Sequence, residues 1–354
     1  MPQRNAVFIP HARLDGPMSE SLDLLVLGNA IVDLIAQTDE DFLAAQGVPK
    51  GAMQLIDEAR AESLFAAMGP ATIVSGGSGA NTAVGAAMLG ARTSFVGKVR
   101  DDELGGLFAH DLKATGVRFP IAAATDGPAT ARCFILVTPE GERTMNTYLG
   151  ACQGLSPADV DEATVASARV VYLEGYLWDP PAAKDAFRKA VTIAHKAGNA
   201  AALTLSDAFC VGRYRKEFLG LIRDGSVDIL FANMAELQSL YETEDADAAI
   251  RALRDESAAR GNDLLGLVTR SAEGALVIQG GDVQSVPASP VHELVDTTGA
   301  GDLFAAGFLA GHARGLDHVA SARLGALAAA EVIQHIGARP QHDLVALAKA
   351  QGLL

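Results

Sequence analysis

The sequence predicts an α/β protein with three layers, in which a mostly parallel central sheet is flanked by helices and carries a small β lid. From Leu22 onward, short apolar runs alternate with longer amphipathic segments, which is the pattern of βαβ units. The glycine-rich and polar motifs directly follow apolar runs, where ligands bind in such sheets. Two stretches, residues 29–57 and 118–150, interrupt the alternation and predict the lid.

Seven apolar runs have the length of buried strands. They are Leu24–Leu27, Ala71–Val74, Thr93–Val96, Val170–Leu173, Ala202–Leu205, Ile229–Phe231 and Leu265–Val268. Amphipathic segments between and after them predict helices. These are Asp102–Thr115, Pro181–Ala197, Ala235–Tyr241, Ala246–Arg260 and Ala320–His335. Gly337 and Pro340 just beyond the last segment favour a helix stop.

The two lid segments differ from the rest of the chain. Residues 118–150 contain no good helix pattern and predict two or three strands around the turn at residues 139–142. Residues 29–57 start straight after a buried strand, and apolar and polar residues alternate along only part of them. We expect them to pack together with residues 118–150 as a small β lid. Residues 1–20 lack periodicity and predict a loose extension, which leaves residues 21–354 as the expected folded domain.

The charge of the chain limits its partners. Its 43 acidic and 28 basic residues give a formal net charge of −15. Such a surface repels nucleic-acid backbones and anionic lipid, so neither is an expected partner. Any anion site must be built locally, from backbone N–H groups and a few cations.

The cysteines and apolar runs favour a cytoplasmic protein. Cys133, Cys152 and Cys210 form no CxxC or paired spacing, which indicates a reducing compartment and buried thiols. The N-terminus has no long apolar region of a secretory signal, and no run approaches the length of a membrane span. The eight histidines show no metal-ligand spacing, so a zinc site is not expected.

The strongest motif is Asp-Thr-Thr-Gly-Ala-Gly-Asp at residues 296–302, followed by an apolar helix. Gly299, Ala300 and Gly301 can turn backbone N–H groups toward one point, and the helix N-terminus adds a positive dipole. This cradle suits the charge that develops in phosphoryl transfer, and Asp302 beside it is placed to accept a proton from a hydroxyl. A first-turn helix acid after a tight connection is the alternative.

A second motif, residues 75–81, follows an apolar strand and precedes a helix. It is not a dinucleotide fingerprint, because Thr82 stands where the third glycine belongs. A P-loop is excluded as well, since Lys98 is followed by Val99. The motif predicts a wall of Gly76 and Gly77 along a polar ligand, with Asn81 as an anchor; close helix–strand packing explains it equally well.

Polar residues follow three further strands. Asn233 and Glu236 lie on one face of a helix's first turn, where they can hold Mg²⁺ and phosphates or form a capping box. Asp33 interrupts an apolar run after Asn29, and its carboxylate can accept hydrogen bonds from two vicinal hydroxyls, although a lid-rim position is the alternative. In the turn from Thr269 to Gly274, Arg270 can supply a positive charge to a nucleotide, and Arg143 on the lid is a second candidate. The alternative is that both arginines lie at the surface in contact with solvent.

Together these motifs resemble the PfkB (ribokinase-like) carbohydrate kinase family, in the family's order and from about Leu22 to Pro340. The resemblance implies a ribokinase-like fold, ATP as donor and dependence on Mg²⁺. It implies that Asp302 is the base and that residues 299–301 form the anion hole. It also implies that Asn233 and Glu236 serve phosphate and metal, and that Thr298 lies at the nucleotide.

Within the family the sequence is most similar to the adenosine-kinase branch. Its opening Gly-Asn-x-x-x-Asp implies that Asn29 and Asp33 bind a ribose, and Ser78 replaces the lysine that ribokinases usually carry. Segments around Tyr176 and residues 205–209 resemble that branch and imply apolar surface for a base, which Met53 on the lid can complete. Met234 departs from the branch, where a glutamate often follows the asparagine.

The leading hypothesis is therefore transfer of the γ-phosphoryl group of ATP to the 5′-hydroxyl of adenosine, a step of purine salvage. Three rivals stay open: a kinase for ribose, fructose or a related sugar, a non-catalytic nucleoside or ATP sensor, and, more distantly, a dehydrogenase. The sequence does not decide between monomer and homodimer. The turn at residues 335–339 lies where the family often builds a monovalent-cation site, and the resemblance leaves such activation open.

Overall fold

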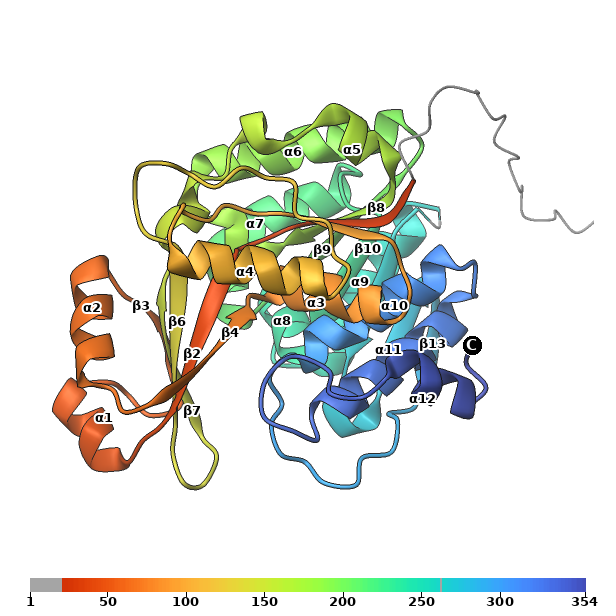
Figure 1. The fold of residues 1–354 in the computed structure, drawn as a ribbon. Coiled ribbons are helices and arrows are strands. Elements are labelled where there is room, and N and C mark those ends of the chain that lie inside the picture. The colour runs from red at the N-terminus through yellow and green to blue at the C-terminus, as the bar shows by residue number, and fades with distance from the viewer. Residues whose placement is uncertain (1–20, 262) are drawn as a thin grey trace, which may run out of the picture.

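The computed structural model describes residues 21–261 and 263–354, so the predicted extension at residues 1–20 lies outside the described residues (Figure 1). Within these ranges the chain forms an eight-stranded sheet and a separate five-stranded sheet. The predicted α/β class is confirmed. No helix of the described chain is long and apolar enough to cross a bilayer.

The large sheet has the strand order β13-β12-β11-β10-β9-β8-β1-β5. Its strands are β1 (Leu22–Leu27), β5 (Thr93–Val96), β8 (Ala168–Glu174), β9 (Ala200–Thr204), β10 (Ile229–Asn233), β11 (Leu265–Thr269), β12 (Ala275–Gln279) and β13 (Asp282–Val286). Pairing is parallel from β5 to β11 and antiparallel at the β12–β13 edge. The parallel strands carry their carboxyl ends to one edge, where ligands bind in such sheets.

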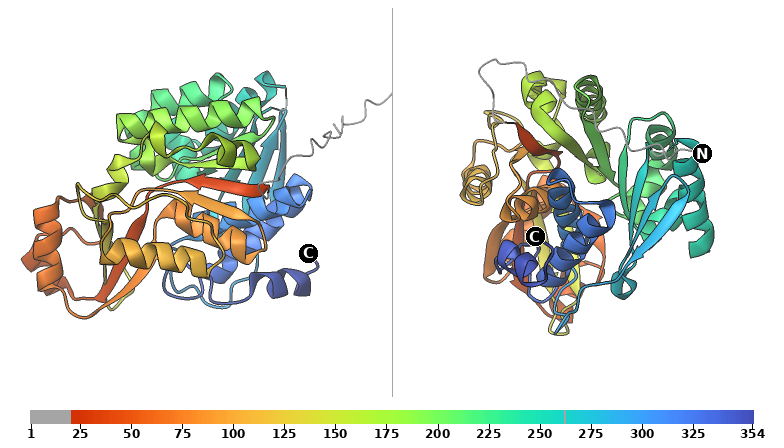
Figure 2. Two further views of the ribbon diagram at one scale, coloured as in Figure 1. Left: turned by 45° about the horizontal axis from the view of Figure 1, so that its top comes forward. Right: turned by 90° about the vertical axis from the view of Figure 1, so that its right-hand side faces the viewer.

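The helices cover both faces of the large sheet (Figure 2). On one face lie α3 (Ser78–Met88), α4 (Glu103–Ala114), α10 (Ala300–Ala313), α11 (His318–Val332) and α12 (Leu344–Ala350). On the other lie α5 (Glu162–Ser167), α6 (Pro181–Lys196), α7 (Ala208–Arg223), α8 (Met234–Leu240) and α9 (Ala246–Ala259). Alternation along the strands produces this division: Val26 and Tyr172 belong to the first core, and Leu25 and Val171 to the second.

The small sheet is mixed, with the order β3-β7-β6-β2-β4. Its strands are β2 (Ile31–Gln37), β3 (Met53–Leu55), β4 (Ala71–Gly76), β6 (Ala131–Val137) and β7 (Arg143–Tyr148). Helices α1 (Glu40–Gln46) and α2 (Glu58–Ala67) pack on one face, where Leu43 and Leu64 join Phe134 in the core. The sheet with its two helices forms the lobe at the left of Figure 1 and corresponds to the predicted lid.

One strand was assigned to the wrong sheet, and one hairpin was missed. The run at residues 71–74 was expected in the main sheet, but it is part of β4 and pairs antiparallel with β2 in the small sheet. Its side chains are partly exposed along much of its length, which marks a half-buried strand. The hairpin of β12 and β13 was not predicted, although the pair Gly280-Gly281 between the two strands is a hairpin signal.

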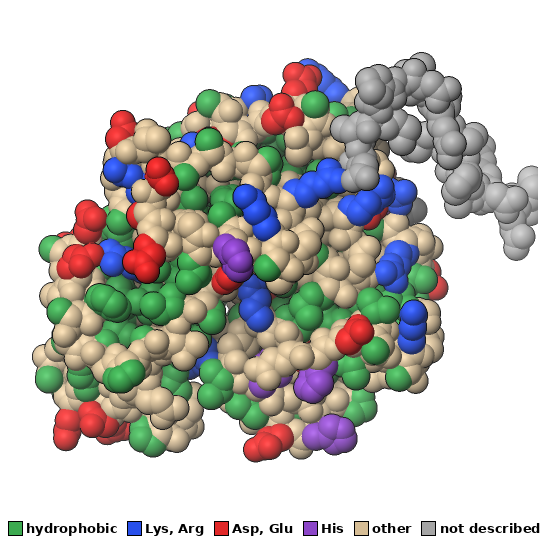
Figure 3. Space-filling model, in the orientation of Figure 1, with side chains coloured by type: hydrophobic (Ala, Val, Ile, Leu, Met, Phe, Trp, Pro, Cys, Tyr) green, Lys and Arg blue, Asp and Glu red, His purple; other side chains and the backbone are tan. Residues whose placement is uncertain are grey.

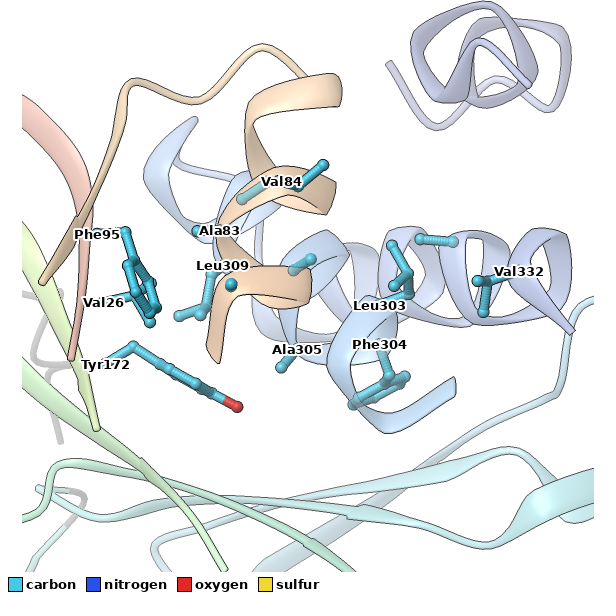
Figure 4. Packing of buried hydrophobic residues seen from close by; sticks show 14 of the residues in the cluster. Val26, Ala83, Val84, Phe95, Tyr172, Leu303, Phe304, Ala305, Leu309 and Val332 are labelled. Atoms are coloured by element: carbon cyan, nitrogen blue, oxygen red, sulfur yellow. The ribbon is translucent and has the colours of Figure 1, made fainter. Parts of the chain in front are cut away.

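Close helix packing fixes the start of α10. A Cβ atom at Gly85 of α3 would lie 2.5 Å from Leu303, and one at Gly307 would lie 2.5 Å from the carbonyl oxygen of Leu324 on α11. Figure 4 shows Leu303, Phe304 and Leu309 of α10 in this core, with Val84 of α3 nearby. Because these contacts are tight, the first turn of α10 has a defined position against α3.

Candidate active site

The motifs meet at the carboxyl ends of the parallel strands, where the small sheet joins the main body. Asn29 follows β1, Glu174 ends β8, and Asn233 ends β10. The N-termini of α3 and α10 point into the same region, because Ser78 and Asn81 of α3 contact Asp302 of α10. Figure 3 shows the surface hollowed between the small-sheet lobe and the main body.

Asp302 is held by two side-chain hydrogen bonds. Ser78 Oγ donates to one carboxylate oxygen at 2.6 Å, and Asn81 Nδ2 donates to the other at 3.0 Å. Burial raises the pKa of Asp302, while these two bonds and the charge of Arg339 act against the rise. A carboxylate that is fixed in this way, with its basicity increased, is suited to accept a proton from a hydroxyl group.

The loop before Asp302, which we call the anion loop (residues 296–302), requires a glycine at its centre. Gly299 has a φ of +80°, and a Cβ atom there would lie 2.7 Å from that of Ala338. No side chain of the described residues caps α10 at Gly299. The Ala300 amide donates to the Thr297 carbonyl oxygen at 3.2 Å, but no side chain caps the first turn, so the positive end of the helix can receive an anion.

Asp296 anchors this loop to neighbouring segments. Its carboxylate accepts hydrogen bonds from Thr298 Oγ1 at 2.8 Å and from the Gly337 amide at 2.8 Å. It also forms an ion pair with Arg143 of β7, so a strand of the small sheet contacts the anion loop directly. Thr298, which the resemblance placed at a nucleotide, turns its hydroxyl toward Asp296 in this structure.

Asp33 lies against the glycine segment (residues 76–79). A Cβ atom at Gly76 would come within 2.1 Å of the Asp33 carboxylate, and one at Gly77 within 2.4 Å of the Asn29 carbonyl oxygen. Side chains larger than hydrogen would push the two segments apart at both positions. Burial raises the pKa of Asp33 to about 7, with Arg339 and Arg143 opposing the rise and Asp302 adding to it.

Glu174 connects Asn29 to the glycine segment through hydrogen bonds. Its buried carboxylate accepts hydrogen bonds from Asn29 Nδ2 at 2.8 Å, from the Asn29 amide at 3.2 Å and from the Gly79 amide at 2.7 Å. It thereby joins the end of β1 to the glycine segment. Burial raises the pKa of Glu174 to about 7, although these N–H donors favour its ionised form.

Asn233 and Glu236 form a reciprocal capping box at the start of α8, as one of the two interpretations expected. Glu236 is nevertheless buried, and burial together with the charges of Asp207 and Asp302 raises its pKa to about 7. Carboxylates that repel one another across a shared space favour a cation between them. The oxygen donors of Asn233 and Glu236 therefore fit Mg²⁺, although no cluster of three or more metal-ligating side chains occurs in the described ranges.

The remaining predicted residues lie around this centre. Thr269 pairs with Asn233 across β10 and β11. Arg270 donates to Glu273 and to Ser285 Oγ, and a contact with a nucleotide would have to replace these bonds.

The positions expected to contact a base differ in how they are held. The Tyr176 hydroxyl donates to the Ser206 carbonyl oxygen at 3.2 Å, which holds its ring beside residues 205–209. Met53 pairs with Met145 in the small sheet. Gly274, which was expected at the nucleotide with Thr269 and Arg270, ends the turn of residues 270–274. It packs tightly, because a Cβ atom there would lie 2.0 Å from the Val286 carbonyl oxygen.

Three residues of the site were missed at the level of sequence: Ser78, Glu174 and Arg339. The signal for Glu174 was an acidic residue directly after the apolar run Val170–Leu173, where burial without a partner is costly. Ser78 was noted only as a substitution within its motif. Arg339 was noted only within the turn at residues 335–339, and its contact with the acceptor site could not be foreseen because its partners are about 260 positions away in the chain.

Comparisons with known proteins identify the family. The family model described as pfkB family carbohydrate kinase matches residues 22–343. The chain belongs to the PfkB family. As a PfkB kinase it is a phosphotransferase, and the resemblance inferred from its motifs is confirmed.

Three relatives of this PfkB kinase span nearly its whole length. The crystal structure of adenosine kinase from Sinorhizobium meliloti is 52% identical, with a TM-score of 0.87, and the match covers 94% of this chain and 99% of that one. A probable sugar kinase from Rhizobium etli is 48% identical, with a TM-score of 0.88 and coverage of 95% and 100%. Adenosine kinase from Saccharomyces cerevisiae is 26% identical over 89% of this chain and 95% of its own.

Proposed function

We propose that this PfkB kinase transfers the γ-phosphoryl group of ATP to the 5′-hydroxyl of adenosine, giving AMP. The names of the Sinorhizobium meliloti and Saccharomyces cerevisiae relatives favour this acceptor. The observation that carries the proposal is that the glycine segment adjoins two carboxylates: Gly76 lies against Asp33, and Ser78 donates to Asp302. One carboxylate can accept both hydroxyls of a ribose, while the other is left for the hydroxyl that reacts.

In the proposed mechanism, Asp302 accepts the proton of the 5′-hydroxyl as the hydroxyl oxygen attacks the γ-phosphorus. The new O–P bond forms as the bond to the β-phosphate oxygen breaks, so ADP leaves. The bonds from Ser78 and Asn81 keep the carboxylate aimed during this step. The open amides at the start of α10 stabilise charge on the transferred group.

Asn233 and Glu236 are the residues that would hold Mg²⁺. When bound there, the cation would neutralise charge on the phosphates of ATP. The small sheet is attached to the anion loop, because its Arg143 forms an ion pair with Asp296. A lobe fixed to the loop in this way can exclude water from the acceptor site, and water is the competing acceptor.

A reducing, cytoplasmic setting fits the thiols. Cys133, Cys152 and Cys210 are all free and buried. Burial raises the pKa of Cys133 and Cys210 to about 12, so both thiols stay protonated and unreactive.

A comparison of acceptors tests the substrate. We expect kcat/KM for adenosine to exceed that for ribose and fructose by at least about 100-fold, because a base adds binding energy worth several kcal/mol. Inosine and guanosine measured in the same assay test recognition of the base. A higher kcat/KM for ribose or fructose would favour a sugar kinase, the activity named for the Rhizobium etli relative.

Asp33→Asn provides the matched test of the ribose contact. It removes a charged acceptor whose hydrogen bonds are each worth about 1.5–3 kcal/mol, so KM for adenosine should rise about 10- to 100-fold while KM for ATP stays near the wild-type value. Equal increases in both KM values would contradict this placement.

A further inference from the structure

Arg339 reaches the acceptor site from the far end of the chain. It lies in the segment after α11, and its guanidinium contacts the small sheet and α3. Nε and Nη2 donate to the Ser75 carbonyl oxygen at 3.3 and 3.2 Å, and Nη2 donates to Ser75 Oγ at 3.3 Å. Nη1 donates to the Ala80 carbonyl oxygen at 3.1 Å.

These bonds bracket the glycine segment. Ser75 lies near the end of β4, and Ala80 lies in the first turn of α3. Between them run the glycines that contact Asp33, the Asn29 backbone and Glu174. The guanidinium therefore fastens both ends of the wall against which the acceptor is proposed to bind. A planar fork of donors suits this role, because it holds two carbonyl groups at fixed directions.

Arg339 also brings a positive charge to the two carboxylates of the site. Its charge lowers the pKa of Asp33 and of Asp302, while the Asp302 charge raises that of Asp33. Burial lowers the pKa of Arg339 to about 10, and the facing carboxylates Asp33, Asp302 and Asp111 oppose this, so the guanidinium stays charged at neutral pH. Without that charge, the repulsion between the two carboxylates of the acceptor site would be left uncompensated.

Other titratable groups face the same carboxylates. Around Asp33 they are Arg143 of β7 and Cys133 of β6. Around Asp302 they are Tyr172 and Glu174 of β8, Tyr176 of the 3₁₀ turn Gly175–Trp178, and Glu236 of α8. The tyrosine and glutamate side chains around Asp302 are either neutral or negatively charged at any pH. Among these groups and Arg339, the positive charge that favours ionised Asp302 therefore comes from Arg339.

We propose that Arg339 is a positioning residue for phosphoryl transfer, which fastens the glycine segment and places a positive charge near Asp33 and Asp302. The inference rests on the proposed function, because it assigns a purpose to these two carboxylates. Arg339 touches neither reacting atom in this account and acts through its neighbours.

The test compares Arg339→Gln and Arg339→Lys with the wild type and with Arg323→Gln, a control at an exposed position of α11. The measurement is kcat/KM for adenosine as a function of pH, with KM for ATP and the thermal unfolding midpoint recorded for each protein. Loss of the charge raises the pKa of both carboxylates, and the ionised forms are the active ones. The acid limb of Arg339→Gln should thus move up by about one pH unit.

Arg339→Lys keeps the charge and loses the fork. Its acid limb should stay near that of the wild type while KM for adenosine rises about tenfold, the loss expected from about 1.4 kcal/mol of hydrogen bonding. Arg323→Gln should match the wild type throughout. If Arg339→Gln does not fold, the KM increase of Arg339→Lys at an unchanged acid limb still supports the inference.

An unshifted acid limb in folded Arg339→Gln would overturn the inference, as would an unchanged KM in Arg339→Lys. A mere structural role would lower activity equally at every pH. Failure of the proposed function looks different, because the wild type would then phosphorylate no adenosine at any pH.

Discussion

Replacing Asp302 with Asn is expected to lower kcat by about 10²- to 10⁴-fold while leaving the affinity for ATP close to the wild-type value. The amide has nearly the same shape and can still accept a bond from Ser78 or Asn81, which now hold the carboxylate at 2.6 and 3.0 Å. It cannot take a proton from an attacking hydroxyl. Coupled measurement of ADP formation and a binding titration with ATP separate the two effects.

The control for this variant is Asp282→Asn, at an exposed position of β13. That protein should retain wild-type kcat and ATP affinity. Turnover within a few-fold of the wild type in Asp302→Asn would remove Asp302 from the role of base.

The second large effect is expected at Glu174. Its carboxylate faces only N–H donors in the hydrogen bonds described here, two from Asn29 and one from Gly79. In Glu174→Gln the amide NH₂ group must point at one of these donors, whichever way the side chain turns. The free energy of unfolding should fall by about 1–3 kcal/mol, the cost of leaving buried groups unsatisfied.

The same substitution should also affect the acceptor. Asn29 and Gly79 lose their common anchor, so KM for adenosine should increase at least about tenfold, while KM for ATP changes less. Denaturant unfolding and steady-state kinetics measure the two effects. Glu244→Gln, at an exposed position before α9, is the matched control, and a Glu174→Gln protein as stable as that control would show that the three bonds carry little weight.

The large sheet was predictable because its strands are buried on both faces. Continuous apolar runs such as Val170–Leu173 therefore stand out from the amphipathic helices. Strand β4 was assigned to the wrong sheet because the apolar pattern of a strand does not determine which strand it pairs with. Its pairing with β2 is antiparallel and depends on the small sheet as a whole.

The anion loop and Asp302 could be predicted because their chemistry is local in sequence. Glycines before a helix and an acid in its first turn lie within one short motif. Ser78 and Arg339 act through contacts between segments more than 200 positions apart. Such contacts follow from the packing of α3 against α10 and from the course of the chain after α11, which no single motif encodes.

The most direct test of the proposed activity follows the phosphoryl group itself. Enzyme, adenosine and ATP radiolabelled at the γ-phosphate are incubated with Mg²⁺, and the products are separated by chromatography. The proposed mechanism predicts labelled AMP, phosphorylated at the 5′ position, in amounts equal to the ADP formed, and formation of both products slowed about 10²- to 10⁴-fold with Asp302→Asn. Labelled inorganic phosphate without labelled AMP, or label on another hydroxyl of the ribose, would contradict it.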